Sequence, residues 1–365
     1  MHFNPSRLIL ARKRRGLSKA VLSDKTKLAL RTLGYYESGE VEPTQESIQN
    51  LARVLNFPPK FFFGADVEEI NFDGASFRSL KAMTSSLRDA SLAAGSLCTE
   101  LEKWIDKRFE LPKPSVPRFP YVEPETAAEM LRTEWGLGQK PIKNVIHLVE
   151  SRGIRVFSLP IDSAKVDAFS VWQNNIPFIF LNPMKSGERG RFDVSHETAH
   201  LCLHGHGVPR TREAELEADR FAAAFLMPRA DVLANIPRAW SMKAIHTLKS
   251  RWKVSASALL VRLHHLNVIT EWQYRTFFIE LNKAGHTKKE LNGIPRESSQ
   301  IIGKVFDALR SEGVTRNSVA NDLFITSAEL NSLIVGLTIS AVEHTDENMP
   351  IQRDEYQERP LLRLV

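Results

Sequence analysis

The stretch RGRFDVSHETAHLCL, residues 189–203, contains two histidines four positions apart, with a glutamate directly after the first. On a helix, residues four apart lie on one face, so His196 and His200 can direct two imidazole nitrogens at one point. Zinc accepts such ligands at about 2.0–2.1 Å. Glu197 lies about 100° around the helix axis, too far to be an easy ligand but well placed to accept a proton. The stretch therefore predicts a zinc-binding helix that also carries a base.

A catalytic zinc ion generally has three protein ligands, so a third ligand is expected downstream. The next acidic run opens the segment EAELEADRFAAAFLMP, residues 213–228. Its apolar residues recur at helical spacing, and the final proline ends the helix. Glu217 lies on the same side as Phe221, so it can face inward, and Glu213, one turn earlier, is the competing candidate.

These residues resemble a known family. HETAHLCLHG at 196–205, followed by EADRFAAAFLMP at 217–228, is similar to the ImmA/IrrE metallopeptidases. The resemblance implies that Glu217 is the third zinc (Zn2+) ligand and that Glu197 is the general base of an endopeptidase. It also implies a substrate class, because relatives cleave helix-turn-helix repressors and so release stress-response or mobile-element genes.

Composition limits the broad class of protein. The chain has 365 residues, enough for two or three domains, with 42% hydrophobic and 25% charged residues, as in soluble globular proteins. No apolar run is long enough to span a membrane, and the N-terminus has no signal-peptide core. With Cys98 and Cys202 as the two cysteines, we expect no disulfide framework and a cytoplasmic location.

Positive charge is concentrated near the N-terminus. Residues 1–65 contain 11 Lys and Arg against five acidic residues, which equals the whole chain's net charge of +6. A concentrated basic segment suggests a polyanionic partner. Capping residues and apolar spacing predict helices at 5–15, 18–25, 29–37 and 44–55. Short helices with a tight turn between the second and third indicate a helix-turn-helix.

Residues 17–43 resemble the XRE (Cro/C1-type) repressors, including Glu-Ser-Gly at 37–39 and Glu-Pro at 42–43. The resemblance implies binding to operator DNA through residues at positions that usually face bases, which are Leu30, Arg31, Thr32 and Tyr35. Lys19 and the cluster Arg12–Arg15 are better placed for phosphates. Lys27 replaces a common glycine, and Leu30 is apolar. The alternative is a dimerisation or docking module that does not bind DNA.

We expect an α+β, mainly helical fold in four parts. These are a five-helix helix-turn-helix domain (1–65), a helical connector with a Pro-rich linker (66–120), a zincin-like metallopeptidase domain with a small antiparallel sheet (121–230) and a helical C-terminal domain (231–365). The linker has four prolines in residues 111–120. Residues 315–337 echo helix-turn-helix spacing, but we favour a plain helical bundle there.

Two classes of function remain open. The first is a DNA-binding regulator fused to a zinc endopeptidase that cleaves a repressor-like protein or itself, in a linker such as 65–75 or 111–120. The second is a non-proteolytic regulator or antitoxin that uses the peptidase fold as a sensor or partner-binding module, including a metal-sensing repressor that would tolerate Glu197→Gln. A homodimer is compatible with either class.

Overall fold

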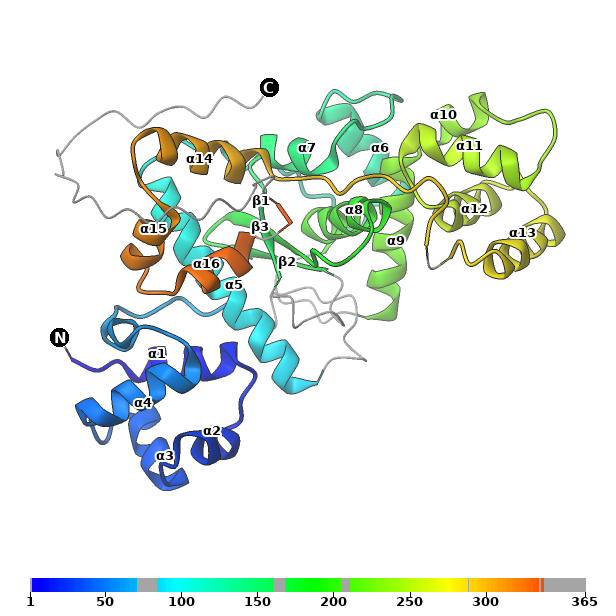
Figure 1. The fold of residues 1–365 in the computed structure, drawn as a ribbon. Coiled ribbons are helices and arrows are strands. Elements are labelled where there is room, and N and C mark those ends of the chain that lie inside the picture. Colours follow the sequence, from blue (N-terminus) through cyan, green and yellow to red (C-terminus); the bar gives the residue numbers. More distant parts are fainter. Residues whose placement is uncertain are drawn as a thin grey trace.

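The computed structural model describes residues 2–70, 84–159, 168–204, 211–287, 289–334 and 336–337. This part of the chain is mainly helical around one three-stranded sheet (Figure 1). The expected start of the connector helix, 76–83, lies outside the described residues, as do residues 71–75 of the loop before it. No helix among the described residues is long and apolar enough to cross a membrane.

The N-terminal unit has the expected helix-turn-helix order. Its elements are α1 (Pro5–Arg14), α2 (Lys19–Thr26), α3 (Leu30–Ser38), α4 (Gln45–Leu55) and the 3-10 helix η1 (Pro59–Phe63). The side chains of Asn4, Ser18 and Thr44 cap α1, α2 and α4, which satisfies backbone N–H groups at the helix starts. Lys27 adopts φ 61° in the turn between α2 and α3, a left-handed conformation that glycine adopts more readily.

Helix α5 (Ser85–Asp106) connects this unit to the sheet. At its start, Ser86 Oγ donates to the carbonyl oxygen of Gly16, and α5 packs along α1. Halfway along, a Cβ atom on Gly95 would come within 2.6 Å of Ile70 Cδ1 and would touch the rings of Phe169 and Phe180. The absent side chain therefore allows Ile70 to approach α5 beside the sheet. Figure 1 shows α5 lying between the N-terminal helices and the sheet, with its far end near α15.

The sheet contains β1 (Arg155–Ser158), β2 (Ala168–Gln173) and β3 (Ile176–Leu181) in the order β1-β3-β2. β2 and β3 form an antiparallel hairpin, and β1 pairs with β3 in parallel. The expected antiparallel sheet is therefore mixed. The physical reason is that the hairpin places β3, rather than β2, beside β1, and β3 runs in the same direction as β1.

The two faces of the sheet contribute to two cores. Four phenylalanines on one face join the core that includes α1 and α5, whereas the alternate positions, such as Val156 and Ile179, join the core around α8 (Gly187–Leu203). This alternation follows from the two-residue period of a strand. The sheet thus separates the core shared with the N-terminal helices from the helices that carry the histidines.

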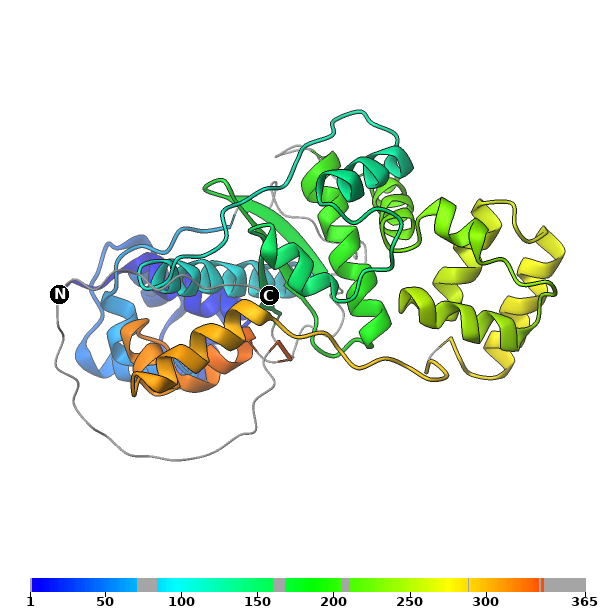
Figure 2. The same cartoon turned by 90° about the horizontal axis from the view of Figure 1, so that it is seen from above.

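Helices complete the region around α8. α6 (Pro124–Glu134), α7 (Val145–Ser151) and α9 (Arg212–Leu226) pack near it, and α10 (Arg229–Ala234), α11 (Met242–Trp252), α12 (Ala256–His265) and α13 (Glu271–Lys283) extend to one side (Figure 1). The chain then returns through α14 (Gln300–Ser311), α15 (Arg316–Asp322) and α16 (Ser327–Ile334). α15 and α16 lie beside α5 in both views (Figure 2), and α14 packs on α7.

A buried carboxylate marks the start of α14. Glu150 of α7 accepts hydrogen bonds from Ser299 Oγ and from the backbone nitrogens of Gln300 and Ile301. Burial raises the pKa of Glu150 to about 7, and these hydrogen bonds oppose the rise only in part.

The Pro-rich stretch is fastened to the surface of the molecule. The backbone nitrogen of Ser115 donates to the Arg152 carbonyl at 2.8 Å, and that of Phe119 donates to the Cys202 carbonyl at 2.8 Å. A Cβ atom on Gly153 would come within 2.5 Å of the backbone at Lys113. Residues 111–119 are in neither helix nor strand, and they form a strap over α7 and the end of α8 rather than a free spacer.

Candidate functional site

The two histidines and the glutamate of the HETAH sequence lie on α8, which packs against β2, β3 and α9. His196 and Glu197 are fully buried, and His200 is 2% exposed. Ser186 caps the start of the helix. Because buried polar side chains need polar partners, the groups around these three residues indicate what the site can hold.

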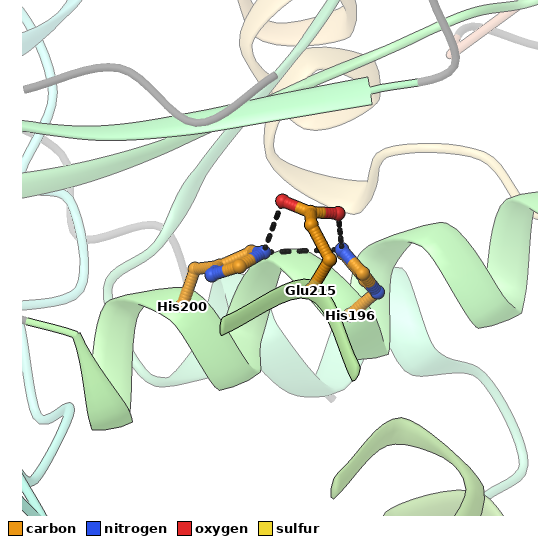
Figure 3. A group of neighbouring side chains, drawn as sticks. All are labelled: His196, His200 and Glu215. Carbon is orange, nitrogen blue, oxygen red and sulfur yellow. Dashed lines mark hydrogen bonds and ion pairs between the residues drawn. The ribbon is translucent and has the colours of Figure 1, made fainter. Parts of the chain in front are cut away.

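A carboxylate from α9 completes a group of three potential ligands. Glu215 Oε2 lies 3.3 Å from His196 Nε2, and Glu215 Oε1 lies 3.5 Å from His200 Nε2. The two Nε2 atoms are 3.1 Å apart (Figure 3). A tetrahedral zinc site with metal–ligand distances of 2.0–2.1 Å has ligand–ligand edges of about 3.3–3.4 Å. His196, His200 and Glu215 therefore fit a zinc ion in both ligand chemistry and spacing.

The structure places the two glutamates expected from the sequence elsewhere. Glu217 Oε2 lies 2.9 Å from His204 Nε2, and Glu213 is exposed on the first turn of α9. Glu215 lies about 20° around the α9 axis from the fully buried Ala222, whereas Glu217 lies about 140° from it. The face that contains the alanines carries Glu215, and small side chains on that face allow α9 to approach α8 closely.

A second ring of side chains contacts the histidines at their other nitrogens. Asp219, one turn after Glu215, has Oδ1 2.9 Å from His196 Nδ1. His204 Nδ1 lies 2.7 Å from His200 Nδ1, so Glu217 is linked to His200 through His204. A carboxylate or other acceptor on Nδ1 fixes the ring and leaves Nε2 available to a metal. Sequence reasoning missed Asp219, although its spacing of four residues from Glu215 was visible.

A residue of the sheet holds the Glu197 side chain in place. Ser170 Oγ on β2 donates to Glu197 Oε2 at 2.7 Å, and both residues are buried. This hydrogen bond fixes the carboxylate next to the ligand group. Burial alone would raise the pKa of Glu215, but hydrogen bonds and positive charge from His196 and His200 lower it far below its ordinary value. Among the three potential ligands, an anionic carboxylate thus faces two imidazole rings.

A second candidate surface lies on α3 and α2. Leu30 is 52% exposed, Arg31 is exposed, and the Arg31 guanidinium lies 5.3 Å from the ring centroid of Tyr35. Thr32 is partly buried, and Lys19 is exposed but lies 3.0 Å from Glu37. Of the five residues expected to face DNA, Lys19, Leu30 and Arg31 are therefore exposed, Thr32 and Tyr35 are half-buried, and Arg31 contacts Tyr35.

The basic cluster Arg12–Arg15, expected to bind phosphates, pairs with acidic side chains of the same chain. Arg12 pairs with Glu37 at 2.5 Å, and Lys13 pairs with Glu69 at 3.1 Å. The next two arginines pair with one glutamate on α16. The acidic partners come from α3, from the loop after η1 and from the C-terminal helices. Much of the positive charge at the end of α1 is therefore used within the molecule.

Comparison with protein families gives two matches. Residues 8–62 match the family model described as Helix-turn-helix. Residues 149–264 match the model of a peptidase family described as IrrE N-terminal-like domain. The second match begins in α7 and ends in α12, so it covers all three potential ligands. A comparison with curated proteins found no match.

Proposed function

From a chain that joins a helix-turn-helix domain to an IrrE-like peptidase domain, we propose a cytoplasmic, DNA-binding regulator with zinc-dependent endopeptidase activity. The observation that carries the proposal is the convergence of His196, His200 and Glu215 at zinc-ligand spacing, with Glu197 beside them. A non-catalytic zinc site has no need of a buried base held by a dedicated hydrogen bond.

The residues have separate tasks in peptide hydrolysis. His196, His200 and Glu215 would hold zinc, which supplies Lewis acidity toward the scissile carbonyl and makes a nearby water molecule more acidic. Glu197 takes the proton from the attacking water and delivers it to the leaving nitrogen, with Ser170 holding its carboxylate in place. Asp219 keeps the His196 ring in the orientation that directs Nε2 inward.

We infer that the substrate is a helix-turn-helix protein, either a separate repressor or this chain itself. Of the two linkers considered for self-cleavage, residues 111–120 are held by backbone hydrogen bonds at Ser115 and Phe119. A protease needs an extended and accessible backbone, so this strap is a poor cleavage site. In the stretch 65–75, Val67 and Ile70 are buried and the Ile70 backbone nitrogen donates to Ser96 Oγ at 3.0 Å. Residues 71–75 lie outside the described part of the chain, and the described residues of both stretches are held in place, so we infer that a separate repressor is the better candidate.

The test combines metal analysis with mapping of new protein termini. Purified wild-type protein should contain one zinc per chain. Cells that express the wild type should show new N-termini in helix-turn-helix proteins, and cells that express Glu197→Gln should not. Glu213→Gln is the matched control, because Glu213 is an exposed acid on α9. Stoichiometric zinc with identical termini in all three strains would refute proteolysis and favour a metal-dependent regulator.

A further inference from the structure

The C-terminal helices α14–α16 repeat the backbone of α1–α3 residue by residue, with an offset of 297 positions. Each unit has three left-handed residues with spacings of 11 and 12, with φ from 55° to 77°: Gly16, Lys27 and Gly39 in the first unit and Gly313, Phe324 and Gly336 in the second. Left-handed residues end helices and set the turns between them, so shared spacing means shared turn geometry. This correspondence favours the helix-turn-helix alternative over the plain helical bundle that the sequence favoured.

Side chains at equivalent positions have the same structural roles. Ser18 caps α2 and its equivalent Thr315 caps α15, each accepting from the backbone nitrogen three residues later. Leu33 of α3 and its equivalent Leu330 of α16 are both fully buried. Backbone hydrogen bonds also correspond, because Gly16 and Gly313 each donate to the carbonyl three residues earlier. The two units thus share caps, turns and core positions.

The two units differ in what their third helix contacts. Glu329 on α16 is equivalent to Thr32 on α3, a position expected to face bases. Its carboxylate accepts from Arg14 Nε at 2.6 Å and from Arg15 Nη1 at 2.7 Å, and its side chain is 3% exposed. Ser332 of α16, the equivalent of Tyr35, accepts from Arg14 Nη2 at 3.2 Å. The face that reads DNA in a helix-turn-helix is here turned onto α1.

Further contacts hold the second unit in this position. Asp322 at the end of α15 accepts from Trp104 Nε1 of α5 at 3.1 Å. Leu330 and Leu333 of α16 are fully buried in the core that also contains Leu8 of α1. By contrast, α3 in the first unit keeps its N-terminal residues exposed. Only the first unit therefore presents a surface that a DNA groove could receive.

We propose that α14–α16 is a second helix-turn-helix unit whose recognition helix binds the N-terminal unit of the same chain instead of DNA. The Glu329 carboxylate binds Arg14 and Arg15 as a DNA phosphate could. The interface is therefore centred on one acidic residue bound by two arginines. The second unit thereby fixes α1, and through α1 it fixes the direction in which α3 points.

Hydrogen exchange on the full-length chain tests this interface. Glu329→Gln and Arg14→Gln should each reduce protection in peptides from both α1 and α16, because each leaves a buried charge without its partner. The double variant should lose less than the sum of the two losses, because the residues are in contact. Glu312→Gln, at an exposed acid on the same unit, is the control, and peptides from α8 and α9 report whether the rest of the fold is intact.

DNA binding tests the competing possibility that the second unit also contacts DNA. Lys19 and Arg316 occupy equivalent positions, so Lys19→Ala and Arg316→Ala are a matched pair. We expect the first to weaken operator binding and the second to leave it unchanged. The proposal is overturned if Arg316→Ala weakens binding as much as Lys19→Ala does, or if Glu329→Gln leaves the exchange of α1 unchanged.

Discussion

Replacing Glu215 by alanine should remove most of the zinc affinity of the protein. The side chain contributes one of three potential ligands and the negative charge among them, at 3.3 and 3.5 Å from the two imidazole nitrogens. Outer partners of metal ligands typically contribute 10–100-fold to affinity, which is about 1.4–2.7 kcal/mol. A direct ligand exceeds that range, so Glu215→Ala should weaken zinc binding by at least about 100-fold.

Glu217→Ala is the informative comparison because both glutamates lie on α9. Glu217 reaches His200 only through His204, so its loss should cost less than about tenfold in affinity, below the range for a direct outer partner. Competition with a chromogenic chelator at one fixed pH measures both values, since ligand protonation alters apparent affinity. If Glu217→Ala loses zinc and Glu215→Ala retains it, the ligand assignment is refuted.

Three further predictions address other contacts. Asp219→Asn should lower zinc affinity by about 10–100-fold because it weakens the hydrogen bond to His196, while leaving DNA binding unchanged in a gel-shift assay. The Glu150 carboxyl has a pKa of about 7 in the folded chain and about 4.5 in the unfolded chain. The folded state therefore binds more protons between these pH values, and the free energy of unfolding should fall by about 3 kcal/mol as pH rises from 4.5 to 7. Chemical denaturation at several pH values should show that slope reduced in Glu150→Gln, and an equal slope in both proteins would contradict the argument. Arg31→Ala should weaken operator binding by about 1–3 kcal/mol while zinc content stays at the wild-type level, and unchanged affinity would exclude Arg31 from the interface.

The parts of the site that lie within one helix were predictable. His196 and His200 depend only on the i, i+4 geometry of α8, and that geometry holds wherever the helix packs. The identity of the third glutamate depends on which face of α9 meets α8. Local periodicity favoured Glu217 because Phe221 faces inward, but α9 is buried on more than one side. That Glu215, and not Glu217, lies beside the two histidines is therefore a tertiary effect.

Charge was harder to interpret than helical pattern. Arg14 and Arg15 look like free cations in the sequence because their acidic partner, Glu329, lies more than 300 residues away. The repeat of the N-terminal unit was similarly obscured, since Lys27 and Phe324 occupy left-handed positions where glycine would have marked the turn. In both cases the information lies in contacts or backbone angles that composition does not show.

The continuous core between α1, α5, the phenylalanine face of the sheet and α16 has a consequence for anyone dividing this protein into fragments. A cut after residue 65 would leave Phe157, Phe178 and Phe180 in the same fragment as α5 and α16, but it would remove Leu8 and its neighbours from the core that they share. Newly exposed apolar surface of this kind promotes aggregation. The isolated peptidase half should therefore be poorly soluble and melt at a lower temperature than the intact chain, even though it contains all three proposed metal ligands.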